Sequence, residues 1–211
     1  MKRRLCILSI LLLAVALPAS ATGINSSIHV ESGEFVEQDL STLNGNIRID
    51  DGATIRGEAE SVNGGVEVGR NVEVQAVSTV NGGVEIGEGA VVEGDVASVN
   101  GPISMEAGSQ AREVGTVNGS VELDGADVET DVSTYNGDVT LRGGTNVGGD
   151  IRIKASRSGS SRRDQALRIY IEDGSTVQGS VIVENEDQEV EVYLRGGSVA
   201  GEIRGATVVE K

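Results

Sequence analysis

Few side chains in this sequence belong to the types that usually carry out chemistry. The 211 residues include one histidine, His29, and one cysteine, Cys6. A zinc site needs several His, Cys or carboxylate ligands, and one histidine cannot supply them. Enzymes that cleave polysaccharides need carboxylates gathered in a cleft, and the aromatic residues that stack on sugars make up only 2% of the chain. The sequence therefore predicts a protein that is not an enzyme, with no catalytic residue, no metal ion and no cofactor.

Carboxylates are abundant, with 33 Asp and Glu against 17 Lys and Arg and a net charge of −16. This charge argues against binding to nucleic acid, which needs a basic surface, and disfavours anionic membranes. Calcium would need six or more oxygens that converge on one point, whereas Glu67 and Glu85 belong to a column along the molecule. We expect a solvated acidic face, and the sequence leaves open whether any cation binds to it.

Two tyrosines are candidates for contact with a partner. Tyr170 and Tyr193 occupy equivalent positions in two related phrases, so we expect them to be neighbours on adjacent repeats. They form either a simple cross-strand stack or a small contact site for sugar or peptide, with Arg142 and Arg195 one corner away. The outward column to which they belong is predicted to contain His29, Arg48, Glu67, Glu85, Ser104, Glu122, Thr140, Tyr170 and Tyr193.

Three arginines form a second candidate contact. Arg157, Arg162 and Arg163 lie in a Ser/Gly-rich stretch that interrupts the repeats, and we expect residues 156–166 to protrude as a loop. On a strongly acidic protein such a loop is either plain solvated chain or an electrostatic contact with an acidic surface.

A repeat of 18 or 19 residues must position all these groups. Phrases such as V-N-G-G-V-E-V return along the chain, and a weaker copy begins at Ile24. A short fixed period of this kind is typical of a solenoid. The Asn residues that mark the repeat are Asn44, Asn63, Asn81, Asn100, Asn118 and Asn136.

A six-residue rhythm lies inside each repeat. It places an apolar residue on each of three sides, and the β-branched residues favour short strands over helices. We predict an all-β, single-stranded parallel β-helix, or β-solenoid, of about nine coils with three short strands per coil. The rhythm predicts an interior that contains Val62, Val68, Val74, Val80, Ile86 and Val92, with Val66, Val72, Val84 and Val96 in a second apolar series.

The Asn-Gly corners are interpreted as structural. Asn and Gly tolerate positive φ, and stacked Asn amides can bond to one another along the axis. A Ser/Thr column just before them predicts a ladder of hydroxyl groups, with an ice-binding face as an alternative use. Its members are Thr42, Ser61, Thr79, Ser98, Thr116 and Thr134.

The first 21 residues have the pattern of a secretory signal peptide. Three basic residues precede an apolar run from Leu5 to Leu17, and small residues follow at Ala19 and Ala21. No cysteine stands at the cleavage point as a lipoprotein would need, and no later segment is long and apolar enough to cross a membrane. We expect residues 22–211 to form one solenoid domain in an exported protein, either periplasmic or at the cell surface.

The repeated V-N-G-x-V-E-V and G-D-V phrases resemble those of a bacterial adhesin-type β-solenoid family, and also those of bactofilins, which are polymer-forming cytoskeletal proteins. The resemblance covers roughly residues 24–209. It favours a right-handed solenoid, although a six-residue rhythm is typical of left-handed ones. It implies a non-catalytic scaffold or adhesion-type protein of the cell envelope, whose partner is a protein or an envelope component. A bactofilin-like polymer that associates through the solenoid ends is the alternative, and an envelope carbohydrate-active enzyme is a second, disfavoured one.

Overall fold

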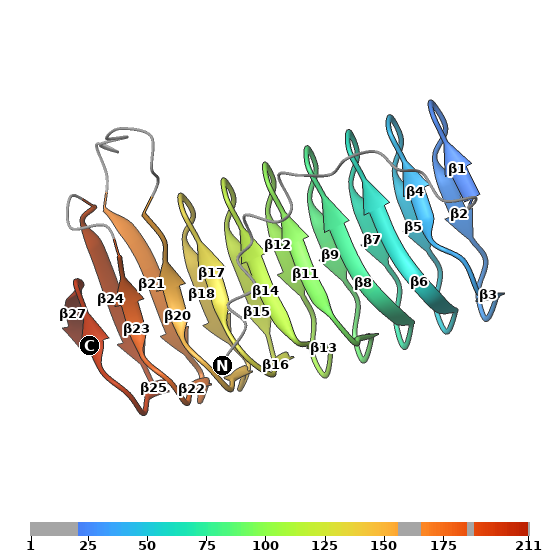
Figure 1. The fold of residues 1–211 in the computed structure, drawn as a ribbon. Helices are drawn as coiled ribbons and strands as arrows, with labels where there is room; N and C mark the ends of the chain where they lie inside the picture. The colour runs from blue at the N-terminus through green and yellow to red at the C-terminus, as the bar shows by residue number, and fades with distance from the viewer. Residues whose placement is uncertain (1–20, 156–165, 185–187, 211) are drawn as a thin grey trace, which may run out of the picture.

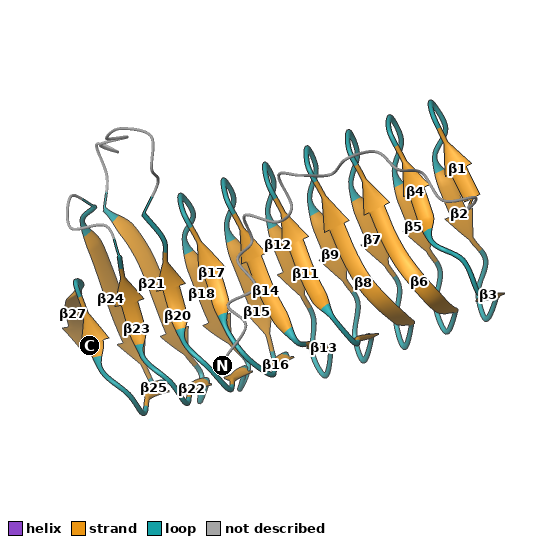
Figure 2. Ribbon diagram, viewed as in Figure 1, coloured by secondary structure: helices purple, strands orange, loops and turns teal. Residues whose placement is uncertain are grey.

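The computed structural model describes residues 21–155, 166–184 and 188–210, and these form a rod of stacked coils (Figure 1). Every regular element in the described residues is a β-strand, and no helix interrupts them (Figure 2). The strands pair in parallel, each with the equivalent strand one coil along. The predicted β-solenoid of about nine coils is therefore confirmed.

The coil has three sides, which we call face 1, face 2 and face 3. Face 1 is a ten-stranded sheet of β2 (Ile28–Val30), β5 (Ile47–Ile49), β7 (Val66–Val68), β9 (Val84–Ile86), β12 (Ile103–Met105), β15 (Val121–Asp124), β18 (Val139–Arg142), β21 (Leu167–Glu172), β24 (Val190–Arg195) and β27 (Thr207–Glu210). Face 2 contains β3 (Phe35–Val36), the first parts of β6 (Thr54–Ser61) and β8 (Glu73–Thr79), then β10 (Val91–Val92), β13 (Gln110–Ala111), β16 (Asp127–Val128), β19 (Asn146–Val147), β22 (Thr176–Val177) and β25 (Ser198–Val199).

Face 3 contains β1 (Ala21–Gly23), β4 (Leu40–Thr42), the last parts of β6 and β8, then β11 (Asp95–Ser98), β14 (Glu113–Thr116), β17 (Val132–Thr134), β20 (Ile151–Ile153), β23 (Val181–Val183) and β26 (Ile203–Arg204). Because β6 and β8 run through the corner between faces 2 and 3, these two faces join into one 17-stranded sheet.

One apolar core fills the interior along the whole rod. On face 1 the strands alternate between inward and outward side chains, so that Val84 is 1% exposed while Glu85 beside it is exposed. A coil cannot bury its apolar residues alone, so adjacent coils depend on one another for stability.

Part of the predicted interior is wrong. Val62 and Val80 lie outside the core and are half-buried, as are Val99 and Val117 in the same positions of later coils. The physical reason is strand alternation: the residue before each, such as Ser61 before Val62, points inward, so the valine must point outward.

The Asn side chains form a continuous ladder at the corner between faces 3 and 1. Each Nδ2 donates to Oδ1 of the Asn one coil earlier, at 2.8–2.9 Å, from Asn25 through to Asn136. The ladder includes Asn44, Asn63, Asn81, Asn100 and Asn118, and it ties the coils together along the outside of the rod.

The Ser/Thr column is not a hydroxyl ladder. Its side chains point inward, and the Thr79 and Ser98 hydroxyls donate to the carbonyls of Gly64 and Gly82 at the preceding Asn-Gly corner. Thr134 is also fully buried, and its Oγ1 has no hydrogen-bond partner among the described residues. Because these hydroxyls are inside the rod, the ice-binding alternative is excluded for this column.

Candidate functional site

Tyr170 and Tyr193 stack on the outer side of face 1. They are paired residues of β21 and β24, and their ring centroids are 4.9 Å apart with an interplanar angle of 24°. The register of face 1 reproduces the whole predicted outward column, from His29 beside Arg48 to Tyr170 beside Tyr193.

Arg195 lies against both rings. Its guanidinium carbon is 5.3 Å from the Tyr170 centroid and 5.4 Å from that of Tyr193. The expected position of Arg195, one corner away, is wrong: it follows Tyr193 by two residues on β24 and therefore shares its side of the strand. Arg142 is engaged elsewhere, in an ion pair with Asp124 at 2.8 Å.

Charged residues fix this aromatic pair from both sides. Arg195 Nη1 is 2.9 Å from Glu172 Oε1. The Tyr193 hydroxyl donates to Glu191 Oε2 at 2.8 Å, and Arg168 Nε is 3.7 Å from the same oxygen. The hydrogen bond to the Glu191 carboxylate raises the pKa of Tyr193 above its ordinary value. We call these six residues the Tyr–Arg patch: Arg168, Tyr170, Glu172, Glu191, Tyr193 and Arg195.

Three members of the patch, Arg168, Glu172 and Glu191, are not among the predicted contact residues, although the sequence contains a signal for them. The strands read L-R-I-Y-I-E and V-E-V-Y-L-R, so the outward residues are Arg, Tyr, Glu on one and Glu, Tyr, Arg on the next. In the structure each arginine faces a glutamate across the strand pair. An aromatic pair framed by oriented charges has the composition of a contact surface.

The arginine-rich insertion follows β20. That strand ends at Ile153 and β21 begins at Leu167. Arg157, Arg162 and Arg163 lie outside the described residues, so the expected loop contact stays a prediction.

A shallow hollow lies on face 1 near the corner with face 2. Its volume is about 370 Å³. The ion pair between Arg142 and Asp124 forms part of its wall. The positive charge of Arg142 therefore offsets part of the negative charge of the carboxylates that line the hollow. It is lined by Glu88, Ser104, Met105, Glu106, Ala107, Glu122, Asp124 and Arg142.

His29 lies on the surface, as expected. Its Nε2 is 2.8 Å from Asp50 Oδ2, and its side chain is 56% exposed. Across the three described ranges, no group of three His, Cys, Asp or Glu side chains is arranged to hold a metal ion. Nowhere in the described part of the chain does a helix offer the length and apolar character needed for a membrane crossing.

An acidic column runs along the edge of face 3 next to face 2. Parallel pairing places Glu113 beside Asp95. Asp131 comes next in the column, because Val132 pairs with Val114, and Asp131 and Glu113 are the residues that precede them.

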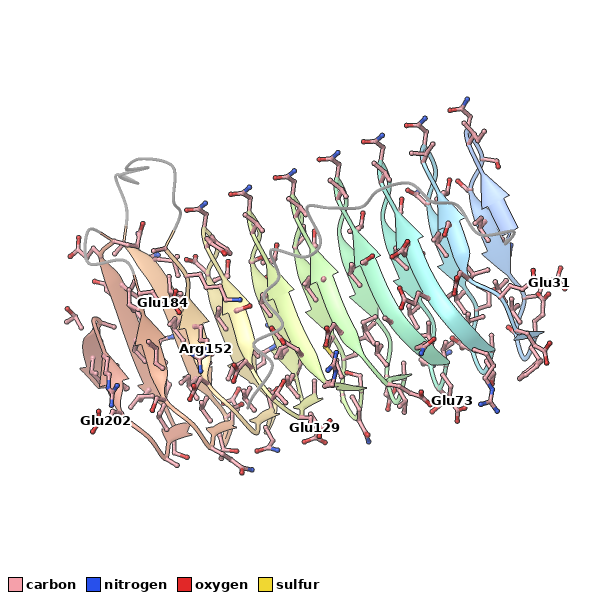
Figure 3. All side chains as sticks on the ribbon, in the orientation of Figure 1. Glu31, Glu73, Glu129, Arg152, Glu184 and Glu202 are labelled. Carbon is pink, nitrogen blue, oxygen red and sulfur yellow. The ribbon has the colours of Figure 1, made fainter. Side chains whose placement is uncertain are left out.

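Arginines neutralise part of this column: Arg152 (Figure 3) bonds to Asp131 at 3.0 Å and to Asp150. Arg112 pairs with Asp95 at 2.9 Å, and Arg204 pairs with Glu202 at 2.6 Å. The register of face 3 assigns to the acidic column Asp39, Glu58, Asp95, Glu113, Asp131, Asp150 and Glu202.

Glu113 has a perturbed pKa because of its position in this column. Burial, and then the nearby Asp95 carboxylate, raise the pKa of Glu113 above its ordinary value of 4.5. A raised pKa in the folded state means that ionised Glu113 opposes folding above that pKa, whereas the protonated acid does not.

Glu113→Gln should therefore stabilise the protein at pH 7, by less than about 1 kcal/mol because the side chain is half exposed to solvent. The advantage should shrink as the pH falls through the raised pKa of Glu113 toward 4.5, and little of it should remain below 4.5. Thermal unfolding followed by circular dichroism between pH 4 and 7.5 measures it, with Glu85→Gln on face 1 as the control. An advantage that grows toward low pH would contradict the assignment.

Comparison with protein-family models, curated proteins and solved structures found no match to this chain.

Proposed function

We propose that this chain is a non-catalytic, exported β-solenoid that acts as a scaffold or adhesion-type binding protein of the bacterial cell envelope. The observation that carries the proposal is the Tyr–Arg patch. Two stacked rings and a guanidinium are held on a continuous sheet by ion pairs, so little side-chain freedom is lost when a partner binds. The rod supports this role, because stacked coils with an external amide ladder make a stiff spacer that presents the patch.

Replacing both Tyr170 and Tyr193 with Ala should reduce binding to the envelope component at least tenfold, since aromatic anchors carry much of the energy of such contacts. The measurement is binding of labelled protein to envelope fractions and to a glycan array. Glu85→Ala/Ser104→Ala is the matched control, because these positions lie in the same outward column at a distance from the patch. Unchanged binding by the tyrosine variant would show that the Tyr–Arg patch is not the surface that binds the envelope component.

A bactofilin-like polymer is the second candidate, and the end coils favour it. Ile24 in the first coil is 63% exposed and Val208 in the last is 41% exposed. Among the described strands, β2 pairs only with β5 and β27 only with β24. An unpaired strand edge with apolar side chains is a template for another coil.

End-to-end association should strengthen as salt rises. The net charge of −16 repels identical molecules, and the Debye length shrinks from about 30 Å at 0.01 M salt to about 8 Å at 0.15 M. Association through the arginine-rich insertion and an acidic face should weaken instead. Light scattering at both salt concentrations separates the two, and a strict monomer at high protein and high salt concentration would count against the polymer.

A further inference from the structure

The corner between faces 3 and 1 repeats a chemically labile dipeptide, Asn-Gly. Asparagine is a thermolabile residue, and it loses its side-chain amide most readily before glycine, which has no side chain to shield the attacking backbone nitrogen. That nitrogen bonds to Cγ of the asparagine, the Cγ–Nδ2 bond breaks, and ammonia leaves. Water then opens the cyclic imide to aspartate or isoaspartate. The asparagines that precede a glycine at this corner are Asn44, Asn63, Asn81, Asn100, Asn118 and Asn136.

In the folded rod the Asn ladder engages the amide group that would react. Asn81 Nδ2 donates to Asn63 Oδ1 at 2.9 Å, and Asn81 Oδ1 accepts from Asn100 Nδ2 at 2.9 Å. Asn63 and Asn100 are bonded on both sides in the same way. Ring closure requires Cγ to come into line with the nitrogen of the following glycine. Turning the side chain to that position would break both hydrogen bonds at once.

The backbone at this corner is held as well. Asn81 N donates to Val62 O of the preceding coil at 2.8 Å, and the Gly82 carbonyl accepts from the Ser98 hydroxyl at 3.0 Å. Gly82 also packs directly on the backbone of Gly64. A rotation of this backbone toward Cγ would therefore have to part neighbouring coils.

We propose that the Asn ladder protects the Asn-Gly dipeptides from deamidation while the protein is folded, and that this protection has a direction. Aspartate has no amide hydrogen, so a deamidated residue no longer donates to the asparagine one coil earlier. Its carboxylate still accepts from the asparagine one coil later. A first deamidation thus weakens the hold on the neighbour toward the N-terminus only, and further damage spreads in that direction. The inference does not depend on the proposed binding role or on the Tyr–Arg patch.

Peptide mapping by mass spectrometry tests the protection in the full chain. The protein is incubated at mildly alkaline pH, either folded or unfolded in guanidinium chloride, and the deamidated fraction of each Asn-Gly peptide is followed with time. The ladder residues with two amide bonds should deamidate at least tenfold more slowly in the folded protein. Equal rates in the folded and unfolded protein would overturn the proposal.

Two substitutions of Asn100 separate the ladder from the general rigidity of the fold. Asn100→Ala removes the donor to Asn81 and the acceptor of Asn118, so both neighbours should deamidate about fivefold faster than in the parent. Asn100→Asp removes only the donor, so Asn81 should accelerate while Asn118 keeps the parent rate. Asn63 retains both ladder bonds in either variant and is the control within the same molecule.

Circular dichroism and the urea midpoint verify that each variant is folded. Asn63→Ala provides a second site if Asn100→Ala fails to fold: Asn44 and Asn81 should then accelerate, while Asn100 keeps both bonds and stays slow. Parent rates at both neighbours of a folded alanine variant would assign the protection to the backbone alone and refute the role of the ladder. Faster deamidation of Asn118 in Asn100→Asp would refute its direction.

Discussion

Replacing Val84 with Asp is expected to destabilise the rod by about 3–5 kcal/mol, the cost of an unpaired charge in a dry interior. Val84 is 1% exposed and lies between Val66 and Ile103 of the neighbouring coils, which are equally buried. No basic side chain lies among these core residues to compensate the carboxylate. Because each coil is stable only against its neighbours, the damage should extend to the adjacent coils.

Glu85→Lys is the matched control for this substitution. Glu85 is exposed on the same strand, beside Glu67 and Ser104, so a change there should alter stability by no more than about 0.5 kcal/mol. Urea unfolding monitored by circular dichroism measures both variants. Equal unfolding midpoints would show that the alternation of inward and outward residues on face 1 is misassigned.

The parts of the fold that follow from strict periodicity were predictable from sequence. On face 1 the coils from β2 to β24 each contribute an inward, outward, inward triplet with apolar residues at both inward positions, so the order from His29 to Tyr193 follows from the sequence alone. The Asn positions are equally regular, and their amides bond along the axis as the spacing indicates.

Face 3 shows where this reading fails. A six-residue count places Val62 and Val80 inside, but a strand side chain is directed by its immediate neighbours, and Ser61 and Thr79 already occupy the inward positions. Hydrophobicity alone could not reveal this, because small hydroxyl residues are buried there and donate to backbone carbonyls. The same count places Arg195 one corner beyond Tyr193, whereas β24 extends as far as Arg195 and keeps both residues on one strand.

The reason for glycine in the Asn-Gly corners also differs from the expectation. Positive φ was expected, but the described glycines with positive φ, such as Gly52 and Gly89, lie in other turns. At the Asn-Gly corners the constraint is closeness: a Cβ on Gly82 would lie 2.2 Å from the Gly64 carbonyl oxygen and 2.5 Å from its carbon. These are backbone atoms of the preceding coil, so they cannot rotate away.

Gly82→Ala should therefore cost about 2–4 kcal/mol, because the coils must separate locally to admit one methyl group. Separation would also stretch the backbone bond from Asn81 N to Val62 O, now 2.8 Å, and the Asn81 amide bond to Asn63, now 2.9 Å. The loss should appear as a lower urea midpoint in the same unfolding experiment.

Gly83→Ala isolates this effect from the general consequences of replacing glycine. Gly83 is the next residue, its φ is not positive, and a Cβ there would approach nothing closer than the Pro102 carbonyl oxygen at 3.4 Å. Alanine restricts the unfolded chain more than glycine does, so this variant should lie within about 1 kcal/mol of the parent and can even be more stable. Similar losses in both variants would mean that chain entropy, and not the close approach of successive coils, requires glycine at this corner.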